Sequence, residues 1–368
     1  MEPASQGGVA VHLAGRMTDL VFGFLRPATA ALAASGVKQV IVLIDAPEYR
    51  HLLPQFDSAV QLVLSPDEGS AWRRWQRLAQ VFRGATERDD LRAVHLHGFV
   101  PLLVCACAMS GRARREVPVY YSPHGSKALG ALRVVTRPAL WATRTAFLPS
   151  AERPIASVSA EASSLKSLLG QPVAVVETPV DAAFFALERR EADTPLVVTS
   201  GRIESPRSAE LVVQMAVLLG GEELRLSFDW IGPVDAVSAM RLKAAGVGVH
   251  AVTAIDERAQ RLGPGWLYVA HGRSRGFPLH LAEAMAAGLP CVAIDSPMHR
   301  SLLRHGDTGM LCSDGEDMLR QVARLVDDRD LRGTMGRAAR REAEQRFVQA
   351  RFRDELLAAY DVERQLPA

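Results

Sequence analysis

The chain has 368 residues, a length typical of two domains of roughly 150 residues each. Apolar residues make up 48% and charged residues 23%, and the net charge is +2; these values exclude a disordered, collagen-like or disulfide-stapled chain. The longest apolar run, residues 100–109, is about half of the roughly twenty residues that span a membrane, so it predicts a buried helix or strand.

Short β-branched apolar runs alternate with helical patterns along the whole chain. In the first half, the predicted strands are 9–13, 39–44, 60–64, 93–96, 117–122, 155–158 and 173–176. In the second half, they are 196–200, 224–231, 247–251, 266–270, 291–294 and 310–312, with helices such as 206–219 and 278–287 between them. This alternation predicts an α/β protein with two Rossmann-like, doubly wound parallel-sheet domains that face a cleft.

A charged, proline-bearing segment separates the two alternating series. We therefore predict an N-terminal domain over 1–180, a linker over 181–195 and a C-terminal domain over 196–349. Only helical patterns follow residue 314, near 315–326, 329–347 and 350–365. The last segment, 350–368, is expected to pack back on the N-terminal domain. Ligands of such sheets bind beyond the carboxyl ends of the strands, so the loops there are the candidate sites.

Two arginines flank the first predicted strand end of the second half. The strand runs into Gly201 and Arg202, and Arg207 follows beside Pro206, which suits the first turn of a helix. Two guanidinium groups beside a glycine turn and a helix N-terminus can hold a diphosphate. A pair of solvated arginines on a βα loop is the alternative interpretation.

A second loop, from His271 to Pro290, opens a helix at Pro278. Its backbone N–H groups and the positive end of that helix favour an anion. Glu283 comes in the second turn of the helix, where a carboxylate can accept hydrogen bonds from two vicinal hydroxyls.

At these residues the sequence resembles the retaining nucleotide-sugar glycosyltransferases of the GT-B fold, the "glycosyl transferases group 1" family. The resemblance covers most of the chain and is strongest over 196–312, through Gly-Arg-x4-Arg and the Gly-Phe-Pro-x4-Ala-Glu-Ala-Met-Ala-Ala-Gly-Leu-Pro run. It implies that Arg202 and Arg207 hold the donor diphosphate and that Glu283 takes the ribose hydroxyls. It also implies a nucleotide diphosphate-sugar as co-substrate, with no cofactor and no metal.

Arg275 departs from this pattern, because the family has an acid at that place in its Glu-x7-Glu motif. One interpretation is that Arg275 recognises an acidic donor sugar, such as a uronic acid, through a charge-assisted pair. The other is that the backbone amides of Gly276, Phe277, Pro278 and Leu279 hold the sugar alone, Pro278 lacking an N–H of its own.

The first half carries fewer candidates. His124, in Ser-Pro-His-Gly after a predicted strand, is expected by resemblance to meet the reacting sugar or the acceptor, where it can donate a hydrogen bond. Gly15, after the first strand, would let the backbone approach the donor. His95 and His97 lie on one strand end, and we expect one to face the core and the other the loop region.

The resemblance implies a metal-independent enzyme that transfers a sugar, with retention of configuration, to a glycan or lipid-linked acceptor in bacterial surface polysaccharide synthesis. A nucleotide-sugar epimerase of the same architecture and a non-catalytic nucleotide-sugar-binding relative are the alternatives. The only Asp-x-Asp sequence, Asp328-Arg329-Asp330, is expected to cap a helix. The N-terminal residues lack the pattern of a secretion signal, which favours a cytoplasmic location.

Positive charge is concentrated in residues 70–145, which hold thirteen Lys and Arg against four acids. The segment from Trp72 to Phe82 places aromatic and apolar residues on one helical face. A core-packed helix with solvated arginines is one interpretation. The other is a reversible, peripheral contact with an anionic membrane on its inner face. No nucleic-acid-binding module is recognisable.

Overall fold

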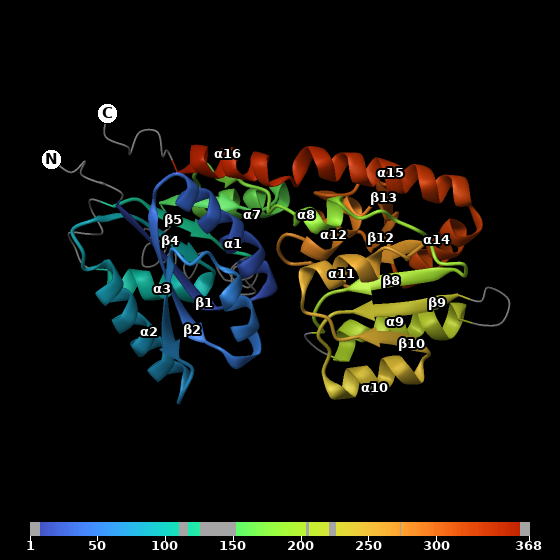
Figure 1. Cartoon of the computed structure of the whole chain (residues 1–368), viewed down its shortest axis with the longest axis horizontal. Coiled ribbons are helices and arrows are strands. Elements are labelled where there is room, and N and C mark those ends of the chain that lie inside the picture. Colours follow the sequence, from blue (N-terminus) through green and yellow to red (C-terminus); the bar gives the residue numbers. More distant parts are fainter. Residues whose placement is uncertain are drawn as a thin grey trace. The chain divides into compact units, whose positions relative to one another are not determined.

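The computed structural model describes residues 8–109, 117–125, 152–203, 206–220, 226–272 and 274–360. The chain divides into two compact units. The first unit comprises Met1–Thr178, Arg275–Phe277 and Ala350–Ala368, and the second comprises Pro179–Ser274 and Pro278–Gln349. Each unit is a parallel sheet with helices packed against it (Figure 1), so the predicted fold class is confirmed.

The sheet of the first unit has the strand order β3-β2-β1-β4-β5-β6-β7, and every pairing is parallel. Its strands are β1 (Val9–Arg16), β2 (Lys38–Asp45), β3 (Val60–Pro66), β4 (Leu91–His97), β5 (Val119–Ser122), β6 (Arg153–Ala156) and β7 (Ala174–Val175). Its described helices are α1 (Asp19–Ala34), the 3-10 helix η1 (Pro47–Gln55), α2 (Ala71–Thr86), α3 (Phe99–Ala108), α7 (Ser159–Leu169) and α16 (Gln349–Ala359). The order reverses between β1 and β4, which is the switch point where ligands of such sheets bind.

The two faces of this sheet bury different side chains. Val9, Val11 and Leu13 of β1 pack with residues of α2, α3 and α7 on one face. Ala10 belongs to the core of the other face, which includes residues of α1 and α16. Successive side chains of a strand point to opposite faces, so an almost continuous apolar run is needed to bury both.

The second unit repeats this topology with the strand order β10-β9-β8-β11-β12-β13. Its strands are β8 (Leu196–Ser200), β9 (Ser227–Ile231), β10 (Val247–His250), β11 (Leu267–Val269), β12 (Cys291–Ile294) and β13 (Gly309–Cys312). Its described helices are α8 (Ala182–Phe185), α9 (Pro206–Leu219), α10 (Ala236–Ala244), α11 (Ile255–Leu262), α12 (Leu279–Ala286), α13 (Pro297–Arg300), α14 (Gly315–Asp327) and α15 (Arg329–Arg346). The switch point lies between β8 and β11.

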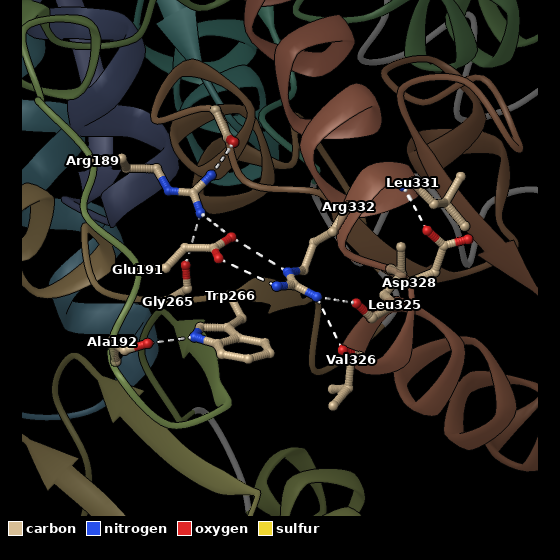
Figure 2. Close-up of polar contacts among 11 residues, drawn as sticks. Arg189, Glu191, Ala192, Gly265, Trp266, Leu325, Val326, Asp328, Leu331 and Arg332 are labelled. Atoms are coloured by element: carbon tan, nitrogen blue, oxygen red, sulfur yellow. Dashed lines mark hydrogen bonds and ion pairs between the residues drawn. The ribbon is translucent and has the colours of Figure 1, made fainter.

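A buried arginine fastens the segment before β8 to this unit (Figure 2). Arg332 of α15 is 2% exposed, lies 4.1 Å over the Trp266 ring and donates to both carboxylate oxygens of Glu191 at 3.2–3.3 Å. Arg189 donates to the Gly265 carbonyl oxygen at 3.0 Å and to Glu191 at 3.3 Å. These contacts hold the segment around 189–191 against the second sheet.

The helix cap expected at the Asp-x-Asp sequence is confirmed. Asp328 is the N-cap of α15, and its side chain accepts a hydrogen bond of 2.9 Å from the Leu331 N–H (Figure 2). The apolar run 100–109 lies almost wholly in α3, a buried helix as predicted. No helix in the described part of the chain combines the length and apolarity needed to cross a membrane.

Candidate functional site

The turn after β8 in the second unit accepts only glycine. Gly201 has φ 128°, and a Cβ added there would lie 2.9 Å from the His280 ring and 3.2 Å from the His271 ring. The Trp230 indole N–H donates to the Gly201 carbonyl oxygen at 3.1 Å, a hydrogen bond that holds the turn in place. The turn therefore brings the ends of β8 and β11 and the first turn of α12 together at the switch point.

His271 follows β11 at this point. Its Nδ1 lies 3.4 Å from the Thr199 hydroxyl, and its ring lies 4.6 Å from the Trp230 ring. Burial lowers the pKa of His271 to about 4, so the imidazole is neutral near pH 7. No role was predicted for this histidine from the sequence.

The N-terminus of α12 faces the same turn through His280. Pro278 is the N-cap residue and makes no side-chain capping hydrogen bond. The first N–H groups of a helix have no partner within the helix, and together with the helix dipole they form an anion site. Pro278 and Leu279 are buried. Both belong to the predicted donor-binding residues.

Glu283 is buried and already paired. It is 2% exposed, and Arg258 of α11 grips it with two hydrogen bonds, Nη2 to Oε1 at 2.6 Å and Nε to Oε2 at 3.1 Å. His280 Nδ1 lies 2.9 Å from Oε2. Burial acts to raise the pKa of Glu283, but Arg258 and His280 outweigh it and hold the pKa below its usual value. The carboxylate is therefore ionised in a network that sequence reasoning missed.

The structure describes the remaining candidates of the second half of the chain as follows. Arg202 is half-buried directly after Gly201. Arg207 lies in the first turn of α9, and its side chain is outside the described residues. Arg275 is exposed, and both Gly276 and Phe277 are buried.

In the first unit, Gly15 lies near the carboxyl end of β1. The register of β1 with β2 shifts between Leu13 and Arg16, the stretch that contains Gly15. Arg16 is exposed and lies 2.5 Å from the Asp67 carboxylate and 3.5 Å from that of Glu48.

His124 occupies a tight turn after β5. Its φ is 47°, a left-handed conformation that non-glycine residues adopt only when the surroundings enforce it. The next residue, Gly125, donates its N–H to Glu161 Oε1 at 2.9 Å, and the Ser157 N–H donates to Oε2 at 2.9 Å. Glu161 therefore anchors the turn that carries His124.

Behind His124 lie three fully buried histidines, His12, His95 and His97. Nitrogens of these three lie within 4.8 Å of one another, a group that could hold a metal ion. The expectation that His95 and His97 face different environments is wrong, because side chains two residues apart share one face of a strand. Burial lowers the pKa of His12 to about 4 and those of His95 and His97 well below the usual value.

Sequence reasoning missed His12 and Arg258 for the same reason. His12 meets His95 only because β1 pairs with β4, and Arg258 meets Glu283 only because the fold brings α11 and α12 within reach of each other. A histidine within a buried strand was the available signal for His12. No local pattern pointed to Arg258.

The basic helix α2 mixes structural and exposed charges. Leu78 and Phe82 are buried, whereas Trp72 is 66% exposed. Arg74 lies 3.2 Å from the Asp67 carboxylate, and Arg83 donates to the Ala108 carbonyl oxygen at 3.3 Å. Some of its arginines are thus used within the fold. The basic segment 70–145 also holds Lys127, Arg133, Arg137, Trp141 and Arg144, which lie outside the described residues.

Comparison with known proteins adds to this geometry. Residues 194–328 match the family "Glycosyl transferases group 1", and residues 28–184 match "Glycosyltransferase Family 4". A sulfoquinovosyl transferase of Arabidopsis thaliana is 31% identical over 185 residues, 47% of this chain and 35% of the relative. The chain thus spans about a third of that relative's length.

A lipopolysaccharide core biosynthesis mannosyltransferase of Rhizobium leguminosarum bv. viciae is 29% identical over 241 residues, 59% of this chain and 67% of the relative. A crystal structure of the Anabaena protein HepE in complex with UDP-glucose has the same fold, with a TM-score of 0.73 over 98% of this chain and 100% of that one, at 16% identity. Two glycosyltransferase family models thus match separate parts of the chain, and the HepE structure shares its fold.

Proposed function

We propose that the chain is a glycosyltransferase that moves a sugar from a nucleotide diphosphate-sugar to a glycan or lipid-linked acceptor. The observation that carries this proposal is the convergence, at the switch point of the second sheet, of the Gly201 turn, Arg202 and the uncapped start of α12. Backbone N–H groups, a guanidinium and a helix dipole at one place suit a diphosphate.

The chemistry follows from the charge that develops during transfer. When the glycosidic bond breaks, the leaving nucleotide diphosphate gains negative charge. Arg202, Arg207 and the start of α12 are assigned to stabilise that charge, which is a role that a metal ion fills in other transferases. We therefore propose transfer without a metal and, from the family resemblance, with retention of configuration.

Glu283 is assigned to the ribose hydroxyls of the donor. A carboxylate has about four acceptor positions, and Arg258 and His280 take three of them, two on Oε2 and one on Oε1. The second position on Oε1 is the one we assign to a hydroxyl. Arg258 keeps the carboxylate ionised and aligned for it. In the first unit, His124 and the backbone at Gly15 are assigned to the sugar or the acceptor.

The acceptor and the donor sugar are proposed from the named relatives and from Arg275. One relative is named for lipopolysaccharide core synthesis, which supports a lipid-linked acceptor in bacterial surface polysaccharide assembly. Arg275 is exposed and lacks any acceptor atom, so it suits an acidic sugar better than a hydroxyl. The other relative is named for transferring a sulfoquinovosyl group, a sulfo-substituted sugar.

A donor panel tests the function. Nucleotide sugars with neutral and acidic sugars are screened by thermal shift, because a ligand at a hundred times its Kd stabilises by about 2.7 kcal/mol. Binders are then incubated with lipid-linked oligosaccharide acceptors, and the anomeric configuration of the product is determined. Binding of a nucleotide sugar followed by transfer supports the proposal. Binding without transfer to any acceptor, or free epimerised nucleotide sugar, contradicts it.

Variants at position 275 test the donor class. Arg275→Glu should lower turnover of an acidic donor while turnover of the matching neutral donor holds or rises, because a carboxylate repels the acidic sugar. Arg275→Ala provides the neutral control. A wild type that uses a neutral sugar, with a silent Arg275→Ala, assigns the sugar to the backbone of 276–279 instead.

A further inference from the structure

Three histidine rings of the first unit form one hydrogen-bonded line that ends at the candidate site. His12 Nδ1 lies 3.1 Å from His97 Nε2, and His97 Nδ1 lies 3.0 Å from His124 Nε2. The His12 and His97 rings stack at 27°, and the His97 and His124 rings stack at 14°. His12 and His97 are buried, while His124 is only half-buried at the turn after β5.

The hydrogen bonds along this line can all point in one of two directions, depending on which nitrogen of each ring carries the proton. A neutral imidazole has one N–H donor and one acceptor nitrogen, so each ring fixes the tautomer of the next. Burial lowers the pKa of all three histidines, which keeps them neutral. The group at the buried end therefore decides what the outer end presents.

Gln39 of β2 stands at the buried end. Its amide nitrogen donates to the Thr29 carbonyl oxygen at 2.6 Å, which identifies the other amide atom as the oxygen. Gln39 Oε1 and His12 Nε2 are both buried, and neither has a hydrogen-bond partner among the described residues. The Gln39 side chain also raises the pKa of His12, as an acceptor beside an N–H does. The register of β1 and β2 pairs Ala10 with Gln39 and His12 with Ile41, so the Gln39 and His12 side chains share one face of the sheet. A His12 proton on Nε2 that faces Gln39 gives both buried atoms a partner, and this is the placement we use.

From the geometry we propose that Gln39, His12 and His97 are positioning residues that fix the tautomer of His124. His12 Nδ1 accepts from His97 Nε2–H, and His97 Nδ1 accepts from His124 Nε2–H. His124 Nδ1 is then left as a lone pair that accepts a hydrogen bond from a substrate hydroxyl. This reverses the expectation that His124 donates.

His95 lies beside this line but outside it. Its Nε2 lies 2.9 Å from the Ser122 hydroxyl, and its Nδ1 lies 2.5 Å from the Tyr360 hydroxyl. Both nitrogens are therefore engaged elsewhere, although the His95 and His97 ring centres are 4.0 Å apart. Tyr360→Phe accordingly perturbs a neighbouring buried histidine without touching the line, and it serves as the matched control.

The tautomer is measured by nitrogen NMR of the full chain labelled at histidine. In the wild type, His124 should carry its proton on Nε2. Gln39→Met removes the acceptor at the far end, so the line can reverse and His124 should gain an Nδ1–H population. His97→Asn keeps an acceptor near the His97 Nδ1 position, so His124 should retain the Nε2–H form. Tyr360→Phe should leave the tautomer unchanged while lowering the melting temperature.

The role of Gln39, His12 and His97 in turnover rests on the proposed function. It is measured by steady-state kinetics, separately from the tautomer. Gln39→Met should lower kcat roughly tenfold, the effect of one hydrogen bond, with the donor KM within about twofold. His97→Asn should keep most of the wild-type kcat, because it keeps the acceptor for His124, and Tyr360→Phe should match the wild type. An unchanged kcat in Gln39→Met overturns the positioning role. A wild type without transfer activity contradicts the proposed function. The NMR measurement of the His124 tautomer then still tests the proposed orientation of the hydrogen bonds from Gln39 to His124.

Two further outcomes overturn the inference. One is a His124 that carries its proton on Nδ1 in the wild type, or one that keeps the same tautomer in Gln39→Met. The other is stoichiometric zinc in the purified protein that quenches the histidine N–H signals, because a metal-bound nitrogen carries no proton.

Discussion

The two units share one strand order around their switch points but place opposite chemistry there. In the first unit, the strand ends carry neutral, buried histidines, His12, His95 and His97. In the second unit, the corresponding region carries the buried ion pair of Arg258 and Glu283. The same topology thus carries an uncharged group of buried side chains in the first unit and a charged pair in the second. The difference is that Glu283 is buried beside the opposite charge of Arg258, whereas the three histidines are buried beside one another.

The largest expected effect is an acid sensitivity of the first unit. The folded pKa of His12 is about 4 and its unfolded value is about 6.5, so the unfolded state binds protons first as the pH falls. This contribution to stability is complete above pH 6.5 and is lost toward pH 4. It amounts to about 3 kcal/mol for His12, and His95 and His97 act in the same direction.

Hydrogen exchange of peptides from β1, β4, β8 and β12 between pH 7.5 and pH 5 measures this effect unit by unit. The second unit has a lowered pKa at His271 and His299, so it should lose some protection over the same range. The first unit should lose more. If β8 and β12 lost their protection at a higher pH than β1 and β4, the predicted greater acid sensitivity of the first unit would be wrong.

The second effect is the loss of the buried ion pair. Glu283→Gln leaves Arg258, whose side chain is 14% exposed, without its carboxylate. Breaking such a pair costs about 3 kcal/mol in the free energy of unfolding, and transfer should be lost with it. Urea unfolding and donor turnover measure the two effects.

The control for that variant is Glu210→Gln. It removes the ion pair between Arg241 and Glu210, in which both side chains are more than 40% exposed. An exposed pair contributes at most about 1 kcal/mol, so the urea midpoint should barely move. Equal effects of the two variants would show that burial does not distinguish them.

A third, smaller effect compares two glycines. Gly201 and Gly36 both have positive φ, but a Cβ at Gly36 would meet nothing within 4 Å, whereas one at Gly201 would meet His280 at 2.9 Å. Gly36→Ala should cost about 1 kcal/mol, the conformational strain alone. Gly201→Ala should cost roughly 1 kcal/mol more and weaken donor binding, because the β8 turn must shift. Thermal unfolding with and without donor separates the two; equal costs would contradict the crowding.

The smallest effect concerns the basic surface of the first unit. We expect the chain to bind anionic vesicles reversibly, with about 1 kcal/mol per basic residue near the surface. Arg73→Glu on α2 should weaken flotation with such vesicles, and the matched variant Arg320→Glu on α14 of the second unit should not. Raised salt should abolish binding, because the attraction is screened. Salt-insensitive binding, or none, leaves these arginines as solvated charges.

Local patterns predicted the elements well where the apolar run was unambiguous. The bounds predicted for β8, β12 and α9 are those of the structure. A short apolar run between turn residues favours a strand there, and an amphipathic run after a proline favours a helix. The interpretation of His95 and His97 failed although their strand was predicted. Their spacing of two residues places both side chains on the same face of the strand.

The sequence alone therefore determined the alternation of strands and helices, and with it the two parallel sheets and the loops at their carboxyl ends. Only the tertiary structure decided which side chains meet there. Arg258 reaches Glu283 across 25 residues, His12 reaches His97 across 85, and His95 reaches Tyr360 across 265. The physical reason is that parallel strands pair through crossovers, so neighbours in a sheet are distant in the chain. The protonation of each group then depends on the partners that this pairing supplies.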